Sequence, residues 1–94
     1  MEPQDFVGRI VDFTAAPYEY GRLRITQCEW AESLCSWVPN HNVLVVGVVE
    51  SGYEVSRLGG RESRRDITNR NMRLHRVSWR YLRENNHAHY TYGV

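Results

Sequence analysis

The chain has 94 residues, enough for a single domain over 1–94, of which 41% are hydrophobic and 12% aromatic. This composition excludes an intrinsically disordered chain. The longest apolar run, 43–49, is far shorter than the roughly 20 residues that cross a bilayer, so no membrane partner is expected.

A formal net charge of +1 conceals a strong asymmetry between the two halves of the chain. Residues 1–56 carry 3 arginines and 8 acids, a net charge of −5, and residues 57–94 carry 9 arginines and 3 acids, a net charge of +6. An acidic half is thus followed by an arginine-rich half, which predicts an anionic partner for the second. Guanidinium pairs with phosphate or carboxylate and stacks on aromatic or base faces.

The basic residues are all arginine, and lysine is absent. Chance, a coding constraint in a compact genome, or selection against a lysine-directed modification would explain this, and the last two favour a small viral or phage accessory protein. The acidic segment 1–5 lacks the features of a secretory signal, which favours the cytoplasm, meaning the host cytoplasm or nucleus for a viral protein. Cys28 and Cys35 are therefore expected to be plain thiols.

The first two predicted elements are strands. Residues Phe6 to Phe13 are rich in β-branched and aromatic side chains and end at the break around Pro17. Residues Arg22 to Cys28 alternate between apolar and polar positions, which is typical of a half-buried strand. We expect the two to pair as an antiparallel hairpin.

A short helix is predicted over Glu29 to Val38. Trp30, Leu34 and Trp37 recur at the spacing of one helical face. They are expected to belong to the core, with anchoring of a homodimer or partner as the alternative.

Two further strands are predicted over 43–50 and 53–58, joined at Ser51-Gly52 as a hairpin. The first is apolar at nearly every position, so we expect it to be central and covered on both faces. The following segment, 61–66, is predicted to be an arginine-rich loop.

The segment 67–84 fits two patterns. As a helix from about residue 68, with Asp66 as N-cap, it would seat Leu74, Val77 and Tyr81 on the sheet and present an arginine ridge outward. As a strand it would scatter the arginines over both faces. We favour the helix. The last ten residues read as a frayed tail or a final strand.

The expected fold class is therefore α+β, in a single small domain. An antiparallel sheet of about four strands would carry two helices in the order β-β-α-β-β-α.

The arginine-rich segment is the candidate binding surface, for nucleic acid or for an acidic partner. Arginines near phosphates release counterions, and interleaved aromatic rings stack on unpaired bases. An inert solvated face is the plain alternative. The candidate residues are Arg57, Arg61, Arg64, Arg65, Arg70, Arg73, Arg76, Arg80, Arg83, Trp79 and His75.

A ribonuclease is a further alternative. Glu54 as base, arginines as phosphate clamps and His89 as acid would supply the required groups. The order of these residues and the ending His89-Tyr90-Thr91-Tyr92 resemble the small microbial guanyl-type ribonucleases over about 40 residues at this end of the chain. The spacing between Arg65 and His89 departs from that family.

No cofactor or metal is expected. Cys28, Cys35 and His41 are spaced too loosely for a zinc site, and His87 with His89 lacks a third ligand.

We therefore expect a non-enzymatic protein that binds RNA or a nucleic-acid complex through its arginines and interferes with a host defence or regulatory pathway. The main alternative is an inhibitor that docks the arginine face on an acidic host protein.

Overall fold

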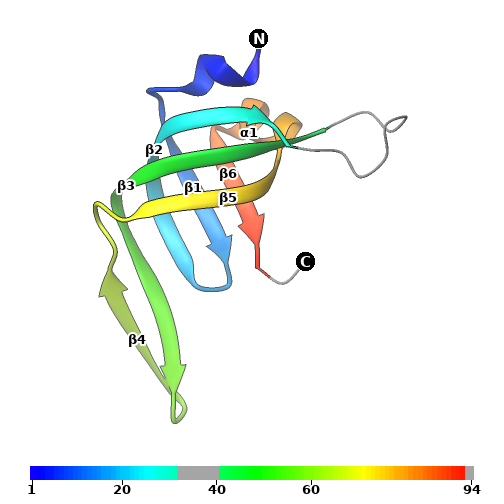
Figure 1. The fold of residues 1–94 in the computed structure, drawn as a ribbon. Coiled ribbons are helices and arrows are strands. Elements are labelled where there is room, and N and C mark those ends of the chain that lie inside the picture. Colours follow the sequence, from blue (N-terminus) through cyan, green and yellow to red (C-terminus); the bar gives the residue numbers. More distant parts are fainter. Residues whose placement is uncertain (32–40, 93–94) are drawn as a thin grey trace.

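The computed structural model describes residues 1–31 and 41–92. In this part of the chain one mixed sheet of six strands is accompanied by one short α-helix and one 3-10 helix (Figure 1). The elements are η1 (Pro3–Phe6), β1 (Ile10–Ala16), β2 (Glu19–Trp30), β3 (Asn42–Leu58), β4 (Arg61–Asp66), β5 (Asn71–Ser78), α1 (Trp79–Asn85) and β6 (His87–Thr91).

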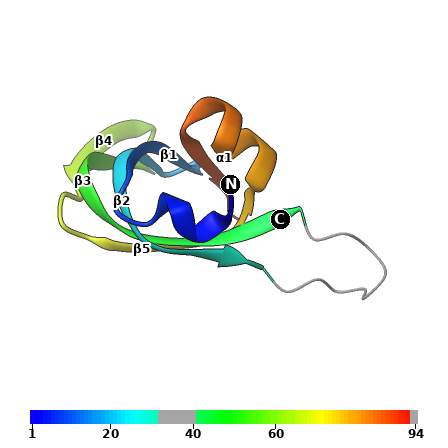
Figure 2. The same cartoon turned by 90° about the horizontal axis from the view of Figure 1, so that it is seen from above.

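The long strand β3 organises the sheet, whose strand order is β4-β3-β2-β1-β6. The first half of β3 lies between β2 and β5, and its second half lies between the start of β2 and β4. All pairs are antiparallel except β1 and β6, which are parallel. The sheet curls so strongly that β5 and β6, joined by α1, contact each other (Figures 1 and 2).

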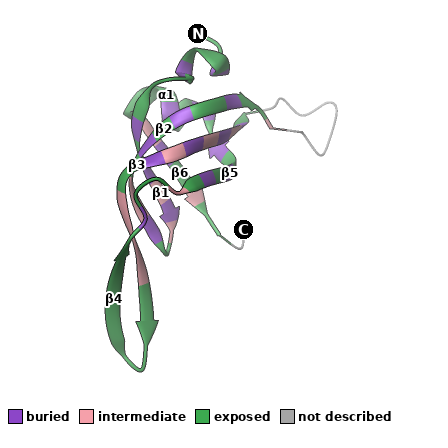
Figure 3. Ribbon diagram, turned by 60° about the vertical axis from the view of Figure 1, so that its left-hand side comes forward, coloured by how far each residue is buried: buried purple, intermediate pink, exposed green. Residues whose placement is uncertain are grey.

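The core lies inside this curl. Alternate residues of the strands point inward and are buried, while their neighbours face solvent (Figure 3). The inward set includes Phe13, Leu23, Val45 and Leu74. Phe6 from η1 packs edge-on against Trp79 of α1, with ring centroids 5.4 Å apart, so both helical segments contribute to the same core.

A β-bulge changes which residues of β3 face inward. Up to Val49 the odd-numbered residues are buried, but the register with β2 shifts between Leu23 and Arg22. Beyond the shift Gly52 lies opposite Gly21. A Cβ on Gly52 would lie 2.6 Å from the Tyr20 carbonyl oxygen, and one on Gly21 would lie 2.2 Å from the Ser51 carbonyl oxygen. Glycine at both positions therefore permits the close approach of β2 and β3 at this bend.

Past the bend, β3 and β4 leave the body of the sheet as a two-stranded arm, residues 53–66 (Figures 1 and 3). The tip is Gly59-Gly60, with φ angles of +60° and +79° that suit a tight hairpin turn. Every residue of β4 is exposed.

The expected α+β fold is wrong, because most of the described chain is strand and one short α-helix replaces the two predicted. Glu29 and Trp30 belong to β2 rather than to a helix, Ala31 follows that strand, and residues 32–38 of the predicted helix lie outside the described residues. The helix predicted from about residue 68 is a strand up to Ser78. A bulge in β5 pairs Leu74 with Val45 and Val77 with Val43, which creates a three-residue apolar spacing that imitates a helix.

Other boundaries also differ from the prediction. Residues 51–52 continue β3 instead of forming a turn, and the segment 61–66 is a strand instead of a loop. The outer side of β3, at Leu44, Val46 and Val48, is half-buried rather than covered.

The hairpin of the first two strands is confirmed, although β1 begins at Ile10 rather than at Phe6. Of the two possibilities for the last ten residues, the structure shows the final strand, β6. Among the residues that the structure describes, no helix is long and apolar enough to span a membrane.

The bend at Gly52 gives a stability prediction. We expect Gly52→Ala to lower the free energy of unfolding by about 1–3 kcal/mol, because the new methyl group would overlap backbone of β2. Urea unfolding followed by tryptophan fluorescence measures this. Gly59→Asn is the control, because no atom lies within 4 Å of its Cβ position and asparagine tolerates a φ of +60°. Equal stability of Gly52→Ala and wild type would contradict the proposed role of the bend.

Candidate nucleic-acid interface

The arm has two chemically different faces. Strand register places Tyr53, Val55 and Arg57 on the same face as Arg64 and Glu62 of β4. We call this the groove face, because it borders a hollow described below. The opposite side, the reverse face, carries Glu54, Ser56, Ser63 and Arg65, and its two serine hydroxyls are 2.9 Å apart. The two faces hold their arginines in different ways.

The groove face, together with the β1–β2 turn, encloses a hollow of about 550 Å³. The Val55 N–H donates to the Tyr18 carbonyl over 2.7 Å, which fixes the turn against the arm. Tyr20 and Tyr53 are cross-strand partners with ring centroids 5.6 Å apart and an interplanar angle of 31°. The lining residues of this Tyr-Arg groove are Pro17, Tyr18, Tyr20, Tyr53, Val55, Arg57, Glu62 and Arg64.

Two arginines and one carboxylate set the charge of the Tyr-Arg groove at 2 − 1 = +1. The Arg64 guanidinium lies 4.7 Å from the centroid of the Tyr53 ring. Glu62 contacts Arg64 at 3.7 Å and Arg57 at 4.0 Å, and all three side chains are exposed. Exposed ion pairs of this length contribute roughly 0–1 kcal/mol, so both arginines can be redirected to a ligand at little cost.

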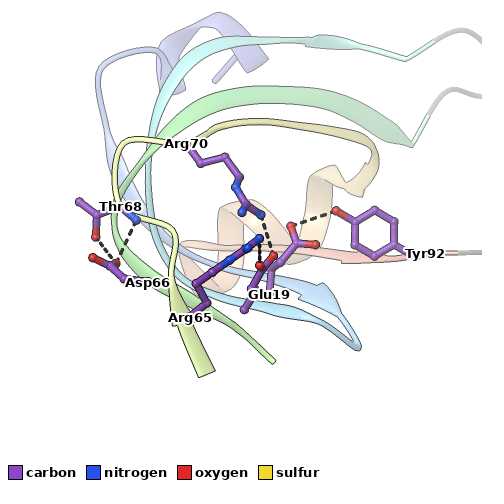
Figure 4. Close-up of polar contacts among 7 residues, drawn as sticks. Glu19, Arg65, Asp66, Thr68, Arg70 and Tyr92 are labelled. Atoms are coloured by element: carbon purple, nitrogen blue, oxygen red, sulfur yellow. Dashed lines mark hydrogen bonds and ion pairs between the residues drawn. The ribbon is translucent and has the colours of Figure 1, made fainter. Parts of the chain in front are cut away.

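On the reverse face, Arg65 belongs to a network at the base of the arm that also includes Arg70 (Figure 4). Glu54 accepts a hydrogen bond from Arg70 Nη1 over 2.9 Å and forms an ion pair with Arg65. The hydrogen bond from Arg70, helped by the charges of Arg70 and Arg65, lowers the pKa of Glu54. These contacts tie β3, β4 and the start of β5 together.

Two neighbouring contacts support this network. The buried Glu19 accepts a hydrogen bond from the Tyr92 hydroxyl over 3.1 Å. Burial and this hydrogen bond raise the pKa of Tyr92 to about 12, so the phenol stays protonated and donates. Asp66 accepts from the Thr68 N–H and hydroxyl at 3.0 and 2.7 Å, which closes the turn after β4 and replaces the predicted helix cap.

The remaining predicted arginines fall into separate groups. Arg61 is exposed beside the arm tip. Arg73 and Arg76, with His75 between them, are exposed on β5 and have no carboxylate partner among the described residues. On α1, Arg80 pairs with Glu84 at 3.0 Å and Arg83 covers the Trp79 ring at 5.2 Å. The expected single arginine ridge is therefore wrong, because the segment that would have carried it is part strand and part helix.

Trp79 is a core residue. It is 7% exposed and packs edge-on against Phe6 and Trp30, at centroid distances of 5.4 and 5.8 Å. It is therefore not an exposed stacking platform.

The groups suggested for ribonuclease chemistry are not brought together. Glu54 pairs with Glu19 in the register, on the inward-facing side. His89 pairs with Thr14 and is exposed on the outer side of the sheet. The carboxylate is also already bound by two arginines.

The thiol of Cys28 is buried, and burial, together with Glu29, raises its pKa to about 11, which makes it a poor ligand or nucleophile. Cys35 lies outside the described residues. Within the described chain, no three His, Cys, Asp or Glu side chains gather as a metal site would require.

Three tyrosines of the Tyr-Arg groove, Tyr18, Tyr20 and Tyr53, were absent from the sequence-based candidates. Their signal in the sequence is weak: Tyr18 and Tyr20 flank Glu19 just after Pro17, and Tyr53 lies more than thirty positions further along the chain. Only the β2–β3 register brings Tyr20 and Tyr53 together.

The Glu54 network predicts a pH dependence. The pKa of Glu54 in the folded protein lies below the ordinary value of 4.5, so the unfolded chain binds a proton first as the pH falls. The stabilisation of the folded state by ionised Glu54 is fully present above about pH 4.5. It is lost as the pH drops through the lower pKa that Glu54 has in the folded protein. We expect Glu54→Gln to be less stable than wild type at pH 6 and to lose less stability between pH 6 and pH 3.5.

Urea unfolding at the two pH values measures this effect, with Glu62→Gln as the control because its ion pairs are long and exposed. If Glu54→Gln lost as much unfolding free energy between pH 6 and pH 3.5 as wild type does, Glu54 would not be the source of the pH dependence.

No family model, no curated protein and no solved structure matches the chain.

Proposed function

We propose that the protein binds single-stranded nucleic acid, RNA in particular, in the Tyr-Arg groove at the base of the arm. The observation that carries this proposal is the meeting of Tyr18, Tyr20 and Tyr53 with Arg57 and Arg64 around one hollow of about 550 Å³. Single-strand-binding proteins combine aromatic faces that stack on bases with arginines that neutralise phosphates.

The aromatic side chains are available for stacking. Tyr18 is 54% exposed, and Tyr20 and Tyr53 are partly exposed. The rings of Tyr20 and Tyr53 contact each other at a centroid distance of 5.6 Å and an interplanar angle of 31°, and both residues keep part of their surface exposed. A base that enters the hollow would contact tyrosine ring surface and the guanidinium groups of Arg57 and Arg64.

The charge of the groove selects against a cationic ligand. A cage of tyrosines with one glutamate can in principle hold a methylated ammonium group. Here Arg64 already lies over Tyr53, and the groove carries +1. An anionic ligand with flat rings fits these features better than a cation does.

An acidic protein would need separate side chains to contact the arginines and the tyrosines, whereas each nucleotide supplies both a phosphate and a ring. Carboxylate side chains pair with guanidinium and have no ring to stack. We therefore rank single-stranded nucleic acid above an acidic protein, and the experiment below separates the two.

Tyr53 provides the first test. We expect Tyr53→Leu to weaken binding of labelled single-stranded RNA by about 5- to 150-fold, since one stacked base is worth about 1–3 kcal/mol. Tyr53→Phe retains the ring and should bind like wild type. Fluorescence anisotropy at low salt measures both, and thermal unfolding confirms that both variants fold.

A polyglutamate peptide and single-stranded DNA are run in parallel with the RNA. Binding of polyglutamate as tight as that of RNA would favour the acidic-protein partner. Absence of binding to every nucleic acid at micromolar protein would overturn the proposal.

The arginines provide the second test. Replacing Arg57 and Arg64 together by glutamine should make the slope of log affinity against log salt concentration shallower by about 1.4, because each phosphate contact to a single strand contributes about 0.7. Arg24→Gln is the matched control, since Arg24 is paired with Glu50 at 2.8 Å elsewhere on the sheet. A slope unchanged in the double variant would exclude these arginines as phosphate ligands.

A further inference from the structure

A second hollow, of about 250 Å³, lies where the curled sheet meets itself between β5 and β6. No backbone ladder joins these two strands among the described residues, so their facing edges leave a seam. The described residues that line this seam pocket are Asn42, Arg76, Ser78, His89, Tyr90 and Thr91.

The bulge in β5 gives Arg76 its position. Three steps along β5, from Leu74 to Val77, match two steps along β3, so β5 has one residue more than its partner here. His75 and Arg76 are both exposed in consequence, and the His75 ring lies 6.4 Å from that of Tyr90 in β6. Bulges re-aim side chains in this way and are frequent beside functional sites.

The polar groups of the seam pocket suit an anion. Arg76 has no carboxylate partner among the described residues, and no described lining residue is acidic. The Ser78 hydroxyl oxygen accepts from the Tyr81 N–H at 3.2 Å, which leaves the hydroxyl proton free to donate. His89 Nε2 and the Thr91 hydroxyl are hydrogen-bonded to each other over 3.4 Å, which uses one donor of this pair and leaves another for a ligand.

The surroundings reinforce this preference. Residues 71–86 carry four arginines and one acid, a net charge of 4 − 1 = +3. The acid, Glu84, is paired with Arg80 and does not line the pocket.

The strand register connects the seam pocket to the Tyr-Arg groove. Tyr53, Tyr20, Thr14 and His89 are direct neighbours on β3, β2, β1 and β6, so they form one row on the outer side of the sheet. Three interstrand spacings make this row about 14 Å long. Tyr53 lines the groove at one end, and His89 lines the seam pocket at the other.

We infer that the seam pocket binds a phosphate group of the same nucleic-acid strand whose bases stack in the Tyr-Arg groove. This inference rests on the proposed function. The strand would follow the outer row across β3, β2, β1 and β6, with Arg76 as the phosphate ligand at the far end.

The experiment compares oligonucleotides of increasing length, from about 2 to about 18 nucleotides, a range that brackets the site sizes of about 4–16 nucleotides found in small single-strand-binding folds. Oligomers that fill the groove alone should bind wild type and Arg76→Gln equally. Oligomers long enough to reach the seam should bind wild type about 10-fold or more tightly than Arg76→Gln, because the second contact is intramolecular. Arg80→Gln, an arginine outside the seam pocket, is the control and should follow wild type.

A titration with inorganic phosphate tests whether the seam pocket binds phosphate, independently of whether one nucleic-acid strand spans both sites. Amide NMR signals of Arg76, Ser78 and Thr91 should shift in wild type and not in Arg76→Gln. Equal losses at all oligomer lengths, or no loss in Arg76→Gln, would overturn the inference even if short oligomers bind. A phosphate response without a length effect would equally exclude a shared strand. Failure of all oligomers to bind would instead remove the proposed function.

Discussion

The close approach of β2 and β3 at Gly21 and Gly52 is the constraint on which the architecture depends. It lets one strand, β3, serve first as the centre of the curled sheet and then as half of the projecting arm. The bulge beside it reverses which residues face inward, so that Glu54 turns toward the buried Glu19 and Tyr53 turns outward toward Tyr20. Core, anchoring network and groove thus all follow from the geometry of one bend.

The two faces of the arm divide the arginines by energetic role. On the reverse face Glu54 is held by Arg65 and Arg70, and this carboxylate binds the arm to the body. On the groove face Arg57 and Arg64 have only long, exposed contacts with Glu62, which cost little to exchange for a phosphate. The number of arginines does not distinguish those that anchor the arm from those available to a ligand. The distance from each guanidinium to its carboxylate partner, and the exposure of that carboxylate, does.

The sequence predicted local alternation well and register poorly. The β1–β2 hairpin was predictable because its first strand is rich in β-branched and aromatic residues and residues 22–26 of its second strand alternate between polar and apolar positions. Two of the failures coincide with bulges: residues Ser51-Gly52 resemble a turn, and the Leu74–Val77 spacing resembles that of a helix. The arginines of the arm were predicted as a binding surface, but the tyrosines beside them were not, because Tyr20 and Tyr53 meet only through long-range pairing.

A protective role for the charges on β4 has to be weighed against a binding role. Charged side chains on an exposed edge strand discourage pairing with other chains, and five of the six residues of β4, all except Ser63, are charged. Edge protection, however, requires no aromatic neighbour. It does not explain why Arg64 lies over Tyr53 or why three tyrosines border the same hollow. The arginines can protect the edge while the protein is free and contact phosphates when it is bound, since both roles need exposed guanidinium groups with weak partners.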